Sequence, residues 1–153
     1  MNESNATRTN SYGFGTTLNA PFGEAVERTK EALKAEGFGV LSTIDVEQTL
    51  REKLGIDFEP YVILGACNPQ LAYRGLQAEH ELGLLLPCNV IVHSHAGKTA
   101  VSIVDPAQML GVVGENAELS AVAEEAGVRL RRVVASLATA SGDAEGASGA
   151  TTN

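Results

Sequence analysis

Two strand-like segments separated by a short turn constrain the fold more than any other feature of this sequence. The segments 88–94 and 98–104 are rich in β-branched residues, and they flank His95-Ala96-Gly97. This length and composition are typical of a β-hairpin, in which the two strands run antiparallel. A chain with such a hairpin does not have the regular strand-helix alternation that builds a parallel doubly wound sheet.

The other predicted elements agree with an antiparallel sheet. Helix boundaries rest on capping signals, because Asp45 and Asn68 each precede a helical pattern and Gly37 and Gly55 each follow one. Strands are predicted over 12–18, 38–44 and 61–67, and helices over 22–36, 46–54, 69–77 and 119–137. The sequence therefore predicts an α+β fold in which helices pack on one face of an antiparallel sheet.

Length and composition indicate how this fold is divided along the chain. The 153 residues suit one domain with a single core. Apolar residues make up 44% and charged residues 20%, as in an ordinary globular protein. We expect a flexible N-terminus over 1–10, the domain over 11–140, and a disordered acidic tail over 141–153, which is rich in Ser, Gly, Ala and Thr and has no hydrophobic periodicity.

Charge and hydropathy disfavour several classes of partner. A net charge of −8 repels phosphate backbones and anionic lipids, so neither a nucleic acid nor a membrane is expected as a partner. The longest apolar run, 82–86, is far shorter than the ~20 residues of a membrane span, and the N-terminus lacks the pattern of a secretory signal. Two cysteines do not make a disulfide framework. We therefore expect a cytoplasmic protein.

The two cysteines are the strongest candidates for chemistry. Cys67 ends a predicted strand immediately before Asn68-Pro69, which begins a helix, and a helix N-terminus lowers the pKa of a nearby thiol. Cys88 begins a strand after Pro87, where a trans peptide bond is the default. Side-chain alternation allows both cysteines to face the core, so the two thiols are predicted to approach each other. Alternatively, each cysteine simply packs as a small apolar residue.

The three histidines are candidate metal ligands. His93 and His95 share one face of a strand and can bind an ion together, although a His-x-His pair without a third ligand is more typical of a polar strand face. His93 and Cys88 point to opposite faces of a regular strand, so a site with both needs a bulge or a partner subunit. His80 lies in a segment without a clear pattern and can join either set. No glycine-rich phosphate loop or nucleophile elbow is present in the sequence.

Four short motifs follow one another along the chain. They are Gly37-Phe38-Gly39-Val40, Gly65-Ala66-Cys67-Asn68-Pro69, Leu85-Leu86-Pro87-Cys88-Asn89-Val90 and Asp105-Pro106. Over roughly residues 12–110, the chain with these motifs resembles the domain of unknown function 302 (DUF302) family. The resemblance implies a β-α-β(4)-α arrangement similar to the TATA-binding-protein-like fold, often as a homodimer, with no assigned activity. It implies no role for the cysteines.

Three interpretations of function remain open. In the first, a dimeric binding or sensing module uses Cys67 and Cys88, with His80 or His93, to bind zinc or copper, or uses the two thiols for redox exchange. In the second, an enzyme of thiol or sulfur chemistry uses Cys67 as nucleophile and Cys88 as resolving thiol. In the third, a structural or small-ligand-binding dimer has cysteines that only pack. A homodimer is expected because the uncovered sheet face carries apolar side chains such as Ile91.

Overall fold

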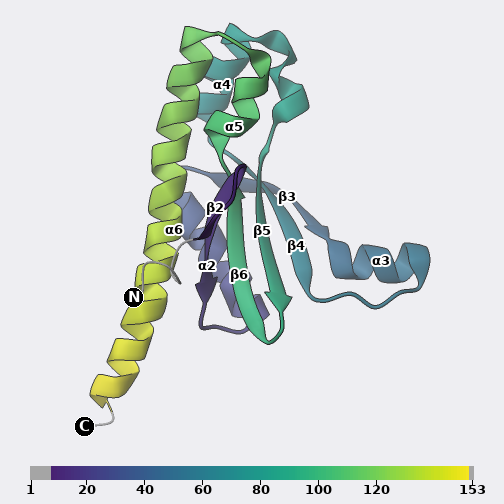
Figure 1. Cartoon of the computed structure of the whole chain (residues 1–153), viewed down its shortest axis with the longest axis vertical. Coiled ribbons are helices and arrows are strands. Elements are labelled where there is room, and N and C mark those ends of the chain that lie inside the picture. The colour runs from purple at the N-terminus through teal and green to yellow at the C-terminus, as the bar shows by residue number, and fades with distance from the viewer. Residues whose placement is uncertain (1–7, 152–153) are drawn as a thin grey trace.

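The computed structural model describes residues 8–151, with side chains for residues 10–138. Six strands form one sheet in the order β1-β2-β6-β5-β4-β3, and every neighbouring pair is antiparallel (Figure 1). The strands are β1 (Arg8–Thr9), β2 (Gly13–Leu18), β3 (Gly39–Asp45), β4 (Tyr61–Cys67), β5 (Cys88–His95) and β6 (Lys98–Val104). The α+β fold with an antiparallel sheet is therefore confirmed, and β5 and β6 form the predicted hairpin.

The helices occupy three places around the sheet (Figure 1). One face is covered by α2 (Phe22–Ala35) and the long α6 (Ala117–Thr151). One end of the sheet is capped by α4 (Pro69–Ala78), α5 (Pro106–Leu110) and the 3-10 helices η1 (His80–Leu85) and η2 (Gly111–Val113). The remaining helix, α3 (Val46–Leu54), extends sideways from the edge of the sheet.

Two helix starts form as the capping signals predict. The Asp45 carboxylate accepts a hydrogen bond of 2.9 Å from the backbone N–H of Gln48, and the Asn68 side chain accepts one of 3.0 Å from Leu71. Gly55 ends α3 in the left-handed conformation with φ of 67°, which costs a glycine little. Segment 78–87, which has no clear sequence pattern, contains η1 and a cis peptide bond between Leu86 and Pro87, so the expected trans bond is wrong.

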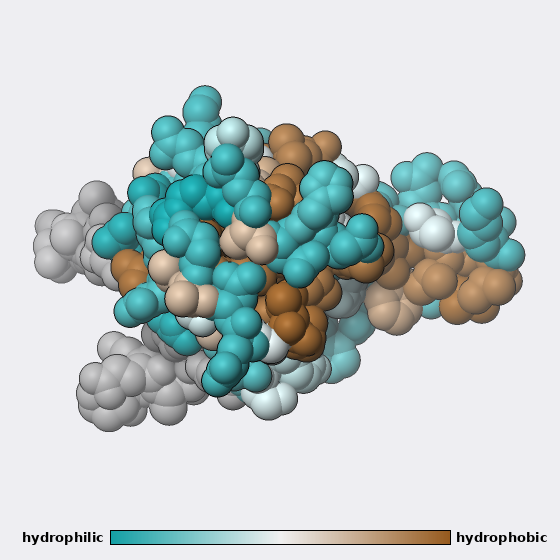
Figure 2. Space-filling model, turned by 90° about the horizontal axis from the view of Figure 1, so that it is seen from above, coloured by the Kyte–Doolittle hydropathy of each residue, from teal (hydrophilic) through white to brown (hydrophobic). Residues whose placement is uncertain are grey.

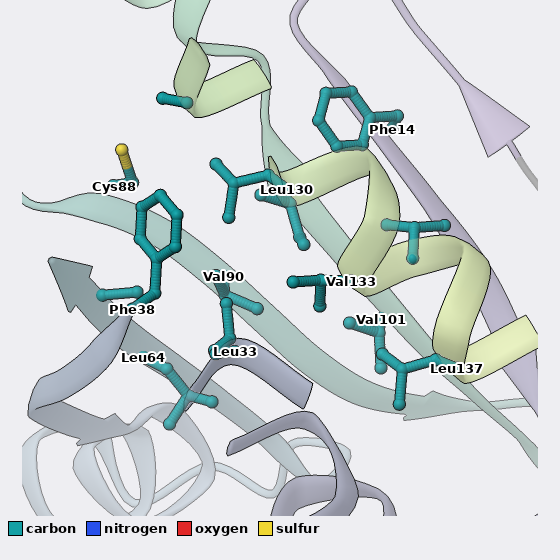
Figure 3. Close-up of a cluster of buried hydrophobic side chains, with 14 of the residues drawn as sticks. Phe14, Leu33, Phe38, Leu64, Cys88, Val90, Val101, Leu130, Val133 and Leu137 are labelled. Carbon is teal, nitrogen blue, oxygen red and sulfur yellow. The ribbon is translucent and has the colours of Figure 1, made fainter. Parts of the chain in front are cut away.

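The core lies between the sheet and the two covering helices. Figure 3 shows side chains from both layers meeting there, among them Leu33, Leu64, Val90, Leu130 and Val133. Cys88, Val90 and Val92 face this core as predicted. In β4, however, the buried alternate residues are Val62, Leu64 and Ala66, so the expectation that the set ending at Cys67 faces the core is wrong.

Both ends of the chain carry regular backbone within segments expected to lack it. Arg8–Thr9 pairs with β2, and the backbone of α6 is helical to Thr151, whereas Leu137 is its last buried side chain among those described. Residues 1–7 and the side chains of the expected tail over 141–153 lie outside the described residues, so the limits predicted for the domain stay a prediction. In the described part of the chain, no helix is both long and apolar enough to cross a membrane.

The helix α3 forms an arm that packs against little else. It has no buried residue, and the strand β3 that leads into it is largely exposed. Figure 2 shows the arm projecting to the right with apolar residues along one side. We call its exposed large apolar side chains, together with those of β3 and of the segment that follows α3, the arm patch: Leu41, Ile44, Leu54, Ile56 and Phe58.

Candidate functional site

The two cysteines lie at the same end of neighbouring strands. Cys67 is the last residue of β4 and Cys88 is the first residue of β5. Because β4 and β5 are antiparallel and Ala66 pairs with Cys88, Cys67 lies one residue beyond the partner of Cys88. Both thiols are free; Cys88 is 8% exposed and Cys67 is partly exposed. The strands therefore bring together residues that are separated by α4 and η1 in the sequence.

Both cysteines border one small apolar pocket at the capped end of the sheet. Its volume is about 40 Å³, which is enough for a single ion or for one or two water molecules. In Figure 3, Cys88 lies beside Phe38 with its sulfur turned away from Leu64 and Val90. Among the described residues that border the pocket, Asn68 is the only one with an amide and none has a carboxylate or imidazole; the apolar ones include Phe38, Leu71, Leu82, Pro106, Leu110 and Val122.

Two glycines allow the motifs around the cysteines to pack closely. A Cβ atom on Gly65 would lie 2.8 Å from the ring of Pro87, so only glycine lets the residue before Cys88 rest on β4. Gly37 has φ of 85°, and a Cβ atom there would lie 2.8 Å from the Asn68 amide nitrogen. The buried Asn68 therefore lies against Gly37 while it caps α4, and this positions the chain directly after Cys67.

Burial governs the ionisation of both thiols. Removal from water raises the pKa of the Cys67 thiol, and it raises the pKa of Cys88 to about 11, with the nearby charge of Cys67 as a second cause. The expectation that the helix N-terminus lowers the pKa of Cys67 is therefore wrong, because desolvation by burial raises it.

The structure places the histidines away from this pocket. His93 and His95 are at the other end of β5, and His93 lies five positions along the strand from Cys88, roughly 17 Å. The His93 ring stacks on Tyr61 at 5.2 Å between ring centroids, and Nδ1 of His95 lies 2.9 Å from the Glu59 carboxylate. His80 is exposed at the start of η1. The described residues contain no group of three or more His, Cys, Asp or Glu side chains arranged to hold a metal ion.

Two further residues of the motifs, Pro69 and Asn89, contribute to local secondary structure rather than to the pocket. Pro69 is the first residue of α4 and is exposed, and it suits that position because its missing N–H is not needed there. Asn89 pairs with Gly65 across the ladder and is exposed. Both residues therefore lie next to the cysteines without bordering the pocket.

One residue at the pocket has no signal in the sequence. Met109, in the short helix α5, borders the same pocket as the two cysteines and is partly buried. The helix begins where the Asp105 carboxylate accepts a hydrogen bond of 3.0 Å from the N–H of Ala107, so the Asp105-Pro106 motif marks its start. That motif can be recognised as a cap, but it does not indicate that the following turn covers the cysteines.

Comparisons with known proteins agree with this fold. A crystal structure of an uncharacterized conserved protein DUF302 from Bacillus stearothermophilus matches with a TM-score of 0.77 and 33% sequence identity, over 84% of this chain and 99% of that chain. Comparison with curated proteins finds no match. The family model described as "Domain of unknown function DUF302" matches residues 14–137, which include the sheet from β2 onward, both cysteines and the covering helices. The chain therefore belongs to the DUF302 family.

Proposed function

We propose that this protein is a small binding module that captures a soft metal ion with the thiols of Cys67 and Cys88. The observation that carries the proposal is that both cysteines lie at the same end of neighbouring strands and border one small apolar pocket. Two thiol groups from neighbouring strands that border one pocket are candidate donors for the same soft ion.

The surroundings of the thiols favour soft ions over hard ones. Mg²⁺ and Ca²⁺ require oxygen ligands, and the only side-chain oxygen among the described residues at the pocket is the Asn68 amide oxygen, which already accepts the N–H of Leu71. Sulfur ligands select copper(I), zinc and similar ions. The two thiols hold their protons at neutral pH, so binding releases protons to solvent as the thiolates form.

The same features give little support to thiol catalysis. A nucleophilic cysteine needs a lowered pKa or an adjacent base, whereas burial raises the pKa of both thiols. No described residue at the pocket supplies an imidazole or a carboxylate that can act as the base. Redox exchange uses the same two sulfurs, and its product is a disulfide between Cys67 and Cys88 that blocks metal binding.

A cadmium titration tests the proposal, because Cd²⁺ binds thiolates and gives an ultraviolet charge-transfer band. We expect one Cd²⁺ per chain in reduced wild-type protein and loss of the band in Cys67→Ser. His80→Ala is the matched control and should bind as wild type does, because His80 is exposed and does not border the pocket. Absence of a band in the wild type, or an unchanged band in Cys67→Ser, would overturn the proposal.

The homodimer expected from the sequence is a separate proposal. The arm patch supports it, because Leu41 of β3 and Leu54 of α3 are 71% and 66% exposed and α3 has no buried residue. Isolated apolar side chains are common on protein surfaces, but five large ones on one continuous segment of the chain are typical of an interaction surface. The arm patch and the metal pocket are made by different elements, so either proposal can fail alone.

A further inference from the structure

Met109 is a third sulfur-containing residue that borders the pocket of Cys67 and Cys88. After β6 ends at Val104, Asp105 caps the N-terminus of α5, and α5 packs against α6. This packing brings Met109 to the pocket that Cys67 and Cys88 border. Three residues with sulfur-containing side chains, from separate segments of the chain, thus border the same pocket of about 40 Å³.

The donor set differs from what zinc prefers. Structural zinc sites are closed by four ligands in a tetrahedron, usually cysteine and histidine. The described residues here offer three sulfurs, and each histidine lies elsewhere. Thioether and thiolate ligands together select copper(I), which is satisfied by two or three sulfurs.

We infer that the pocket selects copper(I) and binds it through Cys67, Cys88 and Met109. This inference rests on the proposed function, since it adds the identity of the ion and a third ligand to the same site. Binding forms two copper–thiolate bonds and one copper–thioether bond, and the two thiol protons pass to solvent. The oxidation state of copper does not change, because the ion is taken up as copper(I) from a carrier or chelator.

The net charge of the copper(I)-bound site is compatible with its position at the apolar pocket. Copper(I) with two thiolates carries one net negative charge, which an apolar pocket alone would disfavour. Cys67 is partly exposed, so part of this charge stays in contact with water. The thioether of Met109 adds a bond without adding charge.

Methionine also fills gaps in cores without any ligand role, so the test must separate packing from ligation. Met109 and Met1 are the two methionines of the chain. Selenomethionine therefore introduces selenium at Met109 with few competing positions. We would load selenomethionine protein with one equivalent of copper(I) under anaerobic conditions and record X-ray absorption at the selenium edge, with labelled Met109→Leu as the control for Met1.

We expect a selenium–copper vector in the labelled wild type and none in labelled Met109→Leu. In competition with a copper(I) chelator, Met109→Leu should bind copper(I) at least tenfold more weakly, while its Cd²⁺ affinity should be unchanged because cadmium binding depends on the two thiolates. Thermal unfolding without metal checks that Met109→Leu is folded.

The possible outcomes separate the thiol metal site from the role of Met109 as a third ligand. If the wild type binds neither copper(I) nor Cd²⁺, the proposed function itself fails, and this inference fails with it. If the wild type binds both ions but shows no selenium–copper vector, and Met109→Leu binds copper(I) as wild type does, the third ligand is overturned while the thiol site stands.

Discussion

The two ends of the β4–β5 ladder carry different candidate ligands in opposite surroundings. At one end, Cys67 and Cys88 lie under α4, η1 and α5 and border an apolar pocket. At the other end, His93 is partly exposed and His95 is exposed, with its ring beside the Glu59 carboxylate. The difference lies in the helical cover, because β5 supplies Cys88 at one end and both histidines at the other.

This contrast makes the capped end the better candidate for the proposed metal site. A buried thiol has lost its hydrogen bonds to water, so it gains more from a metal ion than an exposed group does. The exposed His95 already has the Glu59 carboxylate as a partner at 2.9 Å. Metal binding, alkaline stability, dimerisation and the Glu59 pKa each test this difference between the two ends of the ladder.

The largest effect should be stabilisation by metal at the capped end. An ion that binds only the folded protein raises the free energy of unfolding by about 4 kcal/mol when its concentration is a thousand times the dissociation constant. We expect a corresponding rise in melting temperature with Cd²⁺ in wild type and in His95→Ala, and none in Cys88→Ala. Equal stabilisation of all three proteins, measured by calorimetry, would remove the contrast between the two ends.

The second effect concerns alkaline pH in the metal-free protein. The folded-state pKa of Cys88 is about 11, above that of an exposed thiol, so the unfolded chain loses this proton first as pH rises. Stability is therefore unaffected by Cys88 in the neutral range and falls between about pH 9 and 11, on the order of 2–3 kcal/mol in total.

The matched variants isolate that loss from other alkaline titrations. Cys88→Ala should show a smaller decrease in the free energy of unfolding over this range, whereas His95→Ala should follow wild type. Urea unfolding at a series of pH values measures this decrease in the free energy of unfolding. An equally steep decrease in Cys88→Ala would mean that the thiol is not held neutral by burial.

The fold and the candidate site could be predicted from the sequence to different degrees. The strand and helix limits are predictable because capping residues such as Asp45 and Asn68 act locally. Which face of β4 is buried cannot be predicted in this way, since Val62 and Ile63 are equally suited to a core. Only packing against α2 and α6 decides between them. Met109 is missed because its place at the pocket depends on how α5 folds back onto α6, a contact between distant segments.

A third prediction asks whether the exposed end stays exposed in solution. If a second copy covers the arm patch, Leu54→Glu should weaken dimerisation roughly tenfold or more, since it removes a large apolar contact and adds a charge. Val128→Glu changes an exposed apolar residue of α6 outside the arm patch and should not weaken it. Sedimentation at several concentrations measures both, and a purely monomeric wild type would exclude the dimer.

The smallest effect should come from the ion pair at the exposed end. The hydrogen bond with His95 lowers the pKa of the Glu59 carboxyl group, so His95→Ala should raise this pKa toward its ordinary value. The pair is in water, so its loss should leave the melting temperature at neutral pH nearly unchanged. NMR titration of the Glu59 carboxyl measures the shift; an unchanged pKa in His95→Ala would show that the pair does not form in solution.

The most direct test of the central claim is X-ray absorption at the cadmium edge of wild-type protein that holds one equivalent of Cd²⁺. We expect that sulfur scatterers dominate the first shell, that they are lost in Cys67→Ser combined with Cys88→Ala, and that they persist when His93 and His95 are both replaced by alanine. A first shell of nitrogen and oxygen alone, or one that changes with the histidines and not with the cysteines, would contradict it.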